Sequence, residues 1–301
     1  MDLLNRFRGC LLGLAVGDAL GTTLEFRARG SFEPLTDIVG GGVFYLKPGQ
    51  WTDDTSMALC LASSLVECNG FDARDQMERY CRWRDEGYWS STGYCFDIGG
   101  TVAAALERYR LTGEPFAGST DPYSAGNGCI MRLAPVPLFY YPDLDAAEHY
   151  SAESSRTTHG AAECVDACRL MARMLVRALA GQPKEQVLLG DSETFRGSPR
   201  ITAIARGKYM DRPEAKIRSS GYVVHTLEAA LWCFWHSQSF ADAVLRAAHL
   251  GEDADTTAAV CGQFAGAFYG EAGIPAHWLE KIALREEIRA LADRLAQGKP
   301  G

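Results

Sequence analysis

Apolar residues recur at intervals of three and four over most of this sequence, and no other feature restricts the possible folds as much. Such spacing places apolar side chains on one face of an α-helix, whereas a half-buried strand alternates apolar and polar residues. Only Gly42–Leu46 has a strand-like composition, and its signal is weak. Helices are therefore predicted over at least eight segments: 53–66, 77–84, 102–109, 161–180, 222–235, 240–250, 255–269 and 278–295.

The stretches between these segments have the composition of loops. Glycine and proline, which interrupt helices, gather around residues 39–50, 112–128 and 196–200. No stretch resembles an interdomain linker, and no fixed-period repeat is present. We therefore expect residues 1–297 to form one compact all-α domain, followed by a flexible tail at 298–301.

The composition fits a globular protein and argues against two classes of partner. Hydrophobic residues make up 47% of the chain and charged residues 23%, which allows a large buried core. The formal net charge is -8. A nucleic-acid or anionic-membrane surface needs clustered lysine and arginine, so both partners are disfavoured. A net charge far from zero also favours a monomer.

The start of the chain and its cysteines indicate a cytoplasmic protein. Charged Asp2, Arg6 and Arg8 stand where a secretory signal would need apolar residues. The apolar run 10–16 is far shorter than the roughly 20 residues that span a bilayer. Ten cysteines are present without a Cys-x-x-Cys pair, so we expect reduced, mostly buried thiols and no zinc site.

Two clusters of acidic and threonine residues precede strongly apolar helices. They are Thr52-Asp53-Asp54-Thr55 and Glu252-Asp253-Ala254-Asp255-Thr256. One acid or threonine at a helix start is commonly a cap for free N–H groups, but each cluster holds more acid than capping requires. Adjacent carboxylates repel unless a cation or a proton separates them, and oxygen donors suit hard cations. If the two helix starts meet, they could hold two such cations.

Other acids and a glycine-rich loop are weaker signals of a site. Asp18 lies among glycines spaced four apart, where helix packing and backbone contacts are the default explanation. Glu25 follows in a loop, and Asp97 precedes another helix, where a cap is the commoner role. The loop 123–132 could hold phosphate through backbone N–H groups, and His159 could reach it, although an isolated histidine there is more often structural.

Taken in order, these pieces resemble the ADP-ribosylglycohydrolase family, which includes dinitrogenase reductase-activating glycohydrolases and ADP-ribosyl-acceptor hydrolases. The resemblance covers nearly the whole chain. The matching stretches are Arg8–Gly13, Gly17–Gly21 with Glu25, Trp51–Thr55, Asp97–Gly99, Gly126–Gly128 through Met131-Arg132, Thr158-His159, Gly221–Val223 and Gly251–Thr256. The resemblance implies an orthogonal all-α bundle with two divalent cations, Mg²⁺ or Mn²⁺.

The resemblance also implies a role for each matching residue. The implied metal ligands are Thr52, Asp53, Asp54, Asp253, Asp255 and Thr256. The implied substrate-binding residues are Gly126, Asn127, Gly128, Cys129, Met131, His159, Gly221 and Tyr222, with the diphosphate on the glycine loop, His159 near the phosphates and Tyr222 at the adenosine end. Glu25 and Asp97 are the implied catalytic acids. Cys129 replaces the usual serine, and a thiol is a weaker hydrogen-bond donor.

The implied function is hydrolysis of the glycosidic bond between ADP-ribose and an acceptor. An arginine side chain of an ADP-ribosylated protein is the first expectation, because Asp97-Ile98-Gly99 resembles the dinitrogenase reductase-activating branch. Serine-linked, O-acetyl and nucleic-acid-linked ADP-ribose remain open, as does an ADP-ribose-binding protein without turnover. A phosphohydrolase is disfavoured because the six histidines are scattered.

Overall fold

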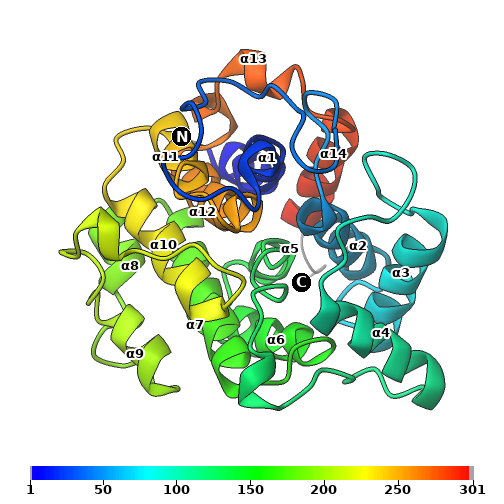
Figure 1. Ribbon diagram of the computed structural model, residues 1–301. Coiled ribbons are helices and arrows are strands. Elements are labelled where there is room, and N and C mark those ends of the chain that lie inside the picture. The colour runs from blue at the N-terminus through cyan, green and yellow to red at the C-terminus, as the bar shows by residue number, and fades with distance from the viewer. Residues whose placement is uncertain (1, 298–301) are drawn as a thin grey trace.

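Residues 2–297 are described by a computed structural model, in which helices account for all the regular structure (Figure 1). The α-helices are α1 (Leu3–Gly21), α2 (Asp53–Glu67), α3 (Ala73–Glu86), α4 (Gly100–Thr112), α5 (Pro135–Tyr140), α6 (Leu144–Arg156), α7 (Ala162–Leu179), α8 (Lys184–Leu189), α9 (Pro199–Ala205), α10 (Val223–Trp235), α11 (Phe240–Ala248), α12 (Ala254–Tyr269), α13 (Ala276–Leu279) and α14 (Arg285–Ala296). Short 3-10 helices are η1 (Thr22–Leu24), η2 (Pro122–Ser124), η3 (Glu214–Lys216) and η4 (Glu271–Gly273). The all-α prediction is confirmed.

The central helix α1 is buried on all sides over most of its length, from Cys10 to Gly21. Figure 1 looks nearly along its axis and shows α2, α11, α12, α13 and α14 around it. An apolar helix without a polar face needs such a surround, because each of its faces must be removed from water. None of the helices in residues 2–297 combines the length and apolarity required to cross a membrane.

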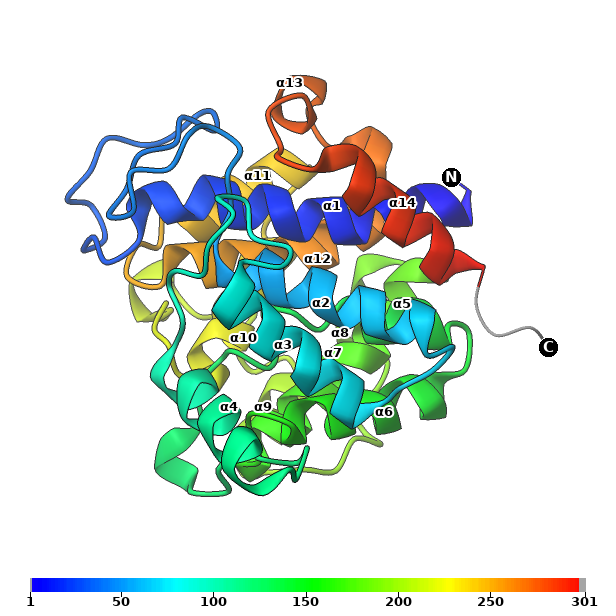
Figure 2. The ribbon, with the colours of Figure 1, turned by 90° about the vertical axis from the view of Figure 1, so that its right-hand side faces the viewer.

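Glycines bring α1 and α12 into backbone contact. A Cβ atom on Gly17 would lie 2.1 Å from the carbonyl oxygen of Ala258, and one on Gly13 would lie 2.3 Å from that of Gly262. The pairing continues to Gly21, whose Cβ would meet the Ala254 carbonyl, so the two helices run antiparallel, side by side (Figure 2). The expected packing role of these glycines is confirmed. It also places the C-terminal end of α1 beside the acidic start of α12.

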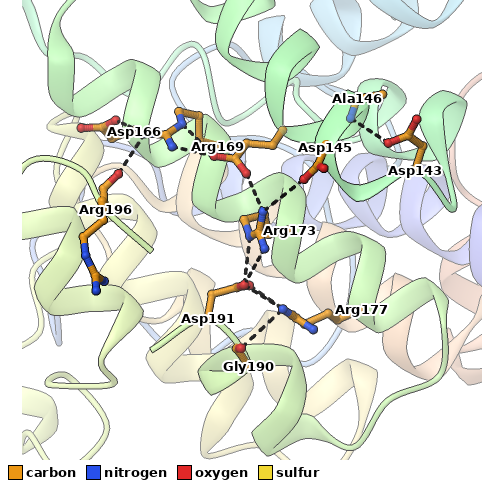
Figure 3. Close-up of polar contacts among 11 residues, drawn as sticks. Asp143, Asp145, Ala146, Asp166, Arg169, Arg173, Arg177, Gly190, Asp191 and Arg196 are labelled. Atoms are coloured by element: carbon orange, nitrogen blue, oxygen red, sulfur yellow. Dashed lines mark hydrogen bonds and ion pairs between the residues drawn. The ribbon is translucent and has the colours of Figure 1, made fainter. Parts of the chain in front are cut away.

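An arginine ladder ties α7 to its neighbours, away from the acidic clusters. Arg169, Arg173 and Arg177 stand one turn apart on α7 (Figure 3). Arg169 and Arg173 both contact Glu148 of α6, while Arg173 and Arg177 both donate to Asp191, whose side chain is buried. Bidentate and shared arginine–carboxylate contacts fix orientation. This network therefore holds α6 and the segment after α8 against α7.

Two predicted elements differ in the structure. The strand candidate Gly42–Leu46 is wrong: an isolated bridge joins Gly41 to Leu46, and the chain between them turns. The helix predicted over 278–295 is broken between α13 and α14, where Leu284 has a φ of 53°. Apolar spacing continues through this break, so periodicity could not reveal it. The predicted tail, 298–301, lies outside the described residues.

The core and its cysteines follow the composition. Buried apolar side chains from α1 to α14 form one cluster, from Phe7 to Leu295. Seven of the ten cysteines are buried, and all ten are free thiols. Burial raises the pKa of Cys95 to about 11, and it raises that of fully buried thiols such as Cys10 and Cys261 further. These thiols act as small apolar side chains.

Candidate active site

The two acidic clusters meet, although about 200 residues separate them. Oγ1 of Thr256, in the first turn of α12, lies 3.4 Å from Oδ2 of Asp54, in the first turn of α2. Oγ1 of Thr52 lies 3.3 Å from the same carboxylate oxygen. Asp54 and Asp255 are both buried, with exposed fractions of 0% and 2%. The close packing of α1 on α12 and of α2 near the end of α1 creates this meeting point.

Asp18 of α1 caps helix α2 from outside. Its Oδ1 accepts hydrogen bonds from the backbone N and Oγ1 of Thr52, both at 2.9 Å. Its Oδ2 accepts from the backbone N of Thr55 at 3.0 Å and from the Thr55 hydroxyl at 2.6 Å. Because Asp18 satisfies these donors, Asp53 and Asp54 are not needed as caps. The default explanation of Asp18, that it satisfies nearby backbone, is confirmed.

The side chain of Asp253, at the start of α12, does not cap that helix either. Asp253 is the N-cap residue by position, but its side chain makes no capping hydrogen bond. Its Oδ2 instead accepts from Nδ2 of Asn127, at 2.9 Å. The same amide nitrogen donates to Thr226 at 2.8 Å, so the loop carrying Asn127 is joined both to α10 and to the acidic cluster. The side chains in both clusters therefore face a common site.

Glu25 and Asp97 reach the same place from two further segments. Carboxylate oxygens of Glu25, Asp97 and Asp255 all lie within 4.8 Å of one another. Glu25 follows η1 at the end of α1, whereas Asp97 has a φ of 56° just before α4. The helix cap of α4 is Gly99, without a side-chain hydrogen bond, so the common explanation of Asp97 as a cap is wrong.

Burial and mutual repulsion shift these carboxyl groups toward their protonated forms. Burial, and then the charges of Asp97, Asp253 and Asp18, raise the pKa of Glu25 to about 9. Burial, followed by Asp18 and Asp253, raises the pKa of Asp97 to about 7. The same two causes, burial first, raise the pKa values of Asp53, Asp54 and Asp255 well above the ordinary aspartate value.

The oxygen atoms of this cluster fit divalent cations. Glu25 Oε2, Asp54 Oδ1 and Asp255 Oδ1 are buried, and among the described residues no group donates a hydrogen bond to them. A buried carboxylate oxygen without a donor is costly unless a cation or a proton compensates it. Hard cations such as Mg²⁺ and Mn²⁺ prefer such all-oxygen donor sets. The donor set therefore suits the two cations expected from the sequence, and gives Glu25 and Asp97 as possible ligands as well.

A cavity of about 290 Å³ opens beside the acids. Its lining comprises Glu25, Phe26, Asp53, Asp97, Gly99, Gly100, Thr101, Val102, Gly126, Asn127, Gly128, Met131, His159, Gly221, Asp253, Asp255 and Thr256. Asp53, Gly99 to Val102, His159, Gly221, and Asp253, Asp255 and Thr256 lie in or within three residues before the first turns of α2, α4, α7, α10 and α12, respectively, whereas Glu25 and Phe26 follow η1 and the remaining residues belong to the glycine loop. Five helix N-termini thus face one cavity, and helix N-termini favour anions.

The glycine loop is held between two other segments. The backbone N of Asn127 donates to Gly221 O at 3.0 Å, and that of Val223 donates to Ala125 O at 3.0 Å. On the other side, the His159 imidazole packs on the loop: a Cβ atom at Gly128 would lie 2.8 Å from His159 Cε1. A side chain at position 128 would therefore displace the imidazole.

Most of the predicted site residues line this cavity, and a few do not. Thr52 and Asp54 lie behind it, fully buried in the acidic cluster. Tyr222 lines a neighbouring cavity with Tyr123 and Arg200, which shares Thr101, Gly126 and Gly221 with the first. Cys129 lines neither cavity: its Sγ is 3.9 Å from both Gly126 O and Cys164 O.

Sequence reasoning missed several lining residues. Phe26 follows Glu25 with a φ of 60° and is 69% exposed. Gly99, the N-cap of α4, is part of a matching stretch but has no predicted role, and Gly100, Thr101 and Val102 form the first turn of that helix. A Gly-Gly-Thr run after an acid is a usable signal of a helix start facing a ligand. Phe26 carried no such signal beyond its place next to Glu25.

Comparison with known proteins agrees with this arrangement. The family model for ADP-ribosylglycohydrolase matches residues 1–301. The chain is 48% identical to ADP-ribosylarginine hydrolase Tri1 of Pseudomonas putida, over 99% of this chain and 79% of that protein. It is 33% identical to the ADP-ribosyl-(dinitrogen reductase) glycohydrolase of Rhodospirillum rubrum, over 97% and 95%. A solved structure, an ADP-ribosylglycohydrolase-related protein complex, superposes with a TM-score of 0.87 at 43% identity and covers 98% of both chains. The chain belongs to the ADP-ribosylglycohydrolase family.

Proposed function

We propose that this protein is a metal-dependent hydrolase that releases ADP-ribose from arginine side chains of proteins. The observation that carries the proposal is the meeting of two acidic clusters beside a cavity that faces five helix N-termini. Such a cavity can hold an anionic diphosphate and, next to it, a sugar. The relatives from Pseudomonas putida and Serratia proteamaculans, at 48% and 44% identity, are both called ADP-ribosylarginine hydrolases, which supports arginine as the acceptor.

The glycine loop is the proposed site for the diphosphate. The backbone N–H groups of Gly128 and Cys129, which have no acceptor among the described residues, provide donors together with the helix starts, without any lysine or arginine in the cavity lining. His159 borders the same loop and offers a ring nitrogen. Tyr222, in the adjoining cavity, is the proposed contact of the adenosine end.

The cations are proposed to be held by Thr52, Asp53, Asp54, Asp253, Asp255 and Thr256. When bound, they would fix hydroxyl groups of the sugar and acidify water. The unpaired oxygens of Asp54 and Asp255 support this assignment, because they have no other partner among the described residues. The shared position of Glu25 and Asp97 with Asp255 leaves a ligand role open to them too.

The carboxylates supply the remaining chemistry. Cleavage of the bond at the sugar's anomeric carbon builds positive charge on the ring, and nearby carboxylates stabilise that charge. Glu25 and Asp97 line the cavity on the side of the acidic cluster. One of them would accept a proton from the attacking water and one would protonate the departing guanidine nitrogen. Burial keeps bulk water from competing with both transfers.

The test is release of free ADP-ribose from arginine-linked and serine-linked substrates, measured in parallel with Mg²⁺, Mn²⁺ or a chelator. We expect release from the arginine linkage alone, and only with a divalent cation. Equal release in chelator would contradict the metal assignment. Release from the serine linkage alone would contradict the acceptor. Binding of ADP-ribose without release from any linkage would identify a binding protein instead.

A further inference from the structure

Arg132 is a buried cation for which the described residues provide no carboxylate partner. Its side chain is fully buried, and no acidic side chain in residues 2–297 forms an ion pair with it. Its guanidinium instead donates to Gly128 O at 3.0 Å, to Thr158 Oγ1 at 2.7 Å and to Ser154 O at 3.3 Å, and lies 4.8 Å from the centre of the Tyr80 ring. A buried charge without a counterion is costly, and such groups commonly have a functional reason.

The contacts of Arg132 lead directly to His159. Thr158 Oγ1 also lies 2.8 Å from Nδ1 of His159, and among the described residues this hydroxyl has no further hydrogen-bond partner. Arginine only donates, so the hydroxyl oxygen must accept from Arg132. The single hydroxyl hydrogen then has one acceptor available, which is Nδ1 of His159.

That contact decides where the imidazole carries its proton. If Nδ1 accepts from Thr158, the proton of a neutral ring is on Nε2. The opposite tautomer would place N–H against a hydroxyl that already accepts from Arg132, and would leave the hydroxyl hydrogen buried without an acceptor. Burial, which Cys129 opposes and Arg132 reinforces, lowers the pKa of His159 to about 4, so a neutral ring is expected at neutral pH.

Nε2 points to the glycine loop. It would lie 3.4 Å from a Cβ atom on Gly126 and 3.2 Å from one on Gly128, and His159 lines the cavity while remaining 98% buried, with an exposed fraction of 2%. Among the described residues, no protein group is hydrogen-bonded to this nitrogen. Its N–H is therefore free to meet an anionic group lying on the loop.

We propose that Arg132 and Thr158 are positioning residues that fix His159 as the Nε2–H tautomer, so that it presents an N–H donor to a diphosphate on the Gly126–Gly128 loop. This inference rests on the proposed function for the identity of the anion. We call the contacts from Arg132 through Thr158 to His159 the relay. Arg132 also fixes the glycine loop, because its guanidinium donates a hydrogen bond to Gly128 O. One buried guanidinium thus sets both the loop and the donor.

The tautomer is measured first, in the full chain without ligand. Histidine ring ¹⁵N labelling and NMR distinguish a protonated from an unprotonated ring nitrogen, and the His159 signals are assigned by their loss in His159→Gln. We expect Nε2 of wild-type His159 to be protonated and Nδ1 to be a hydrogen-bond acceptor. A wild-type spectrum with the proton on Nδ1 would overturn the relay, whatever the variants do.

Two matched substitutions then separate the relay from general packing. Thr158→Val removes the hydroxyl that contacts His159, whereas Thr157→Val removes an equally buried hydroxyl that does not contact His159. The Thr157 hydroxyl accepts a long hydrogen bond from Arg132, at 3.5 Å, and its closer partners are Gln76 Nε2 and Ser154 O. We expect Thr158→Val to shift the ring nitrogen signals and to weaken ADP-ribose binding roughly tenfold, because the imidazole would no longer be held with its N–H toward the diphosphate. Thr158→Ser should restore both, and Thr157→Val should change neither by more than about twofold.

Calorimetry with ADP-ribose and steady-state kinetics distinguish a failure of the relay from a failure of the proposed function. The relay predicts that Thr158→Val raises KM more than it lowers kcat, because the donor binds the diphosphate away from the reacting bond. The expected tautomer without any ADP-ribose binding would leave the relay standing and reject the proposed function. Binding and turnover with the proton on Nδ1, or equal losses in Thr157→Val and Thr158→Val, would reject the relay alone.

Discussion

At the scale of single residues, neighbours in the sequence have different surroundings. Asp53 lines the cavity, whereas Asp54 is fully buried behind it and meets Thr256 from the other end of the chain. Asp255 has one oxygen without a partner. Carboxylates buried this closely repel one another, and the folded chain tolerates them only because packing elsewhere holds the helices in place.

Substitution of Asp255 tests the acidic cluster directly. We expect Asp255→Asn to reduce turnover by at least about a hundredfold, because loss of a ligand should exceed the 10- to 100-fold effects of outer-shell partners. Cation binding, measured by calorimetry, should weaken as well. Glu252→Gln is the matched control, since Glu252 is an acid three residues before Asp255 whose side chain is exposed. Full activity and unchanged cation binding in Asp255→Asn would reject the ligand assignment.

Asp18 shows how a residue in one helix can organise another. All four of its hydrogen bonds come from Thr52 and Thr55, at the start of α2. We expect Asp18→Ala to lower the free energy of unfolding by about 2–4 kcal/mol, because it leaves several buried donors unpaired. The control is Asp72→Ala, which removes the exposed local cap of α3 and should cost only about 1 kcal/mol. Equal denaturation midpoints for the two variants would contradict a special role for Asp18.

At the scale of elements, the contact between α1 and α12 positions the site. The glycines of α1 let the two backbones touch, and this contact carries Glu25, at the end of α1, to the acids at the start of α12. A wider separation of the helices would move these carboxylates apart. The fold therefore depends on small residues at a few positions along one helix face.

Gly17→Ala separates packing from helix propensity. Propensity alone predicts a gain of about 1 kcal/mol for alanine inside a helix. The added Cβ would lie 2.1 Å from Ala258 O, which is backbone and cannot turn aside, so we expect a loss of about 1–3 kcal/mol. Chemical denaturation measures the sign of the change in the free energy of unfolding. A variant more stable than the parent would show that α1 and α12 do not pack as described.

At the scale of the whole molecule, the stability of the metal-free protein should fall as pH rises. The pKa of Glu25 is raised from 4.5 to about 9, and that of Asp97 from 3.8 to about 7. For each group, at pH values between its ordinary pKa and its raised pKa, the folded state holds a proton that the unfolded state has lost. The free energy of unfolding therefore falls as pH rises through this range. We expect a lower melting temperature at pH 8 than at pH 5.5 in chelator.

Added Mg²⁺ provides the control for this pH dependence. A bound cation replaces the protons as the compensating charge and stabilises the folded state by mass action. The fall in melting temperature between pH 5.5 and pH 8 should therefore be smaller with Mg²⁺ than with chelator. A melting temperature that rises with pH in chelator would contradict the burial of these carboxyl groups.

Much of this could be predicted without coordinates, because it depends on local patterns. Periodicity located the long helices, and surplus acid at the starts of α2 and α12 identified the central cluster. The break at Leu284 could not be predicted, since apolar spacing continues across it. The single-domain assignment of residues 1–297, the cytoplasmic location and the monomeric state stay predictions.

The sequence by itself determined the all-helical class, the family and the residue types that gather at helix starts, because each of these depends on short stretches of chain. Only the tertiary structure decided which acids are free to act. It commits Asp18 to capping α2, joins Glu25 and Asp97 to Asp255, turns Cys129 away from the cavity and sets Arg132 behind the glycine loop. These outcomes depend on contacts between side chains that are distant in the chain, and hydrogen-bond partners at such distances leave no local pattern in the sequence.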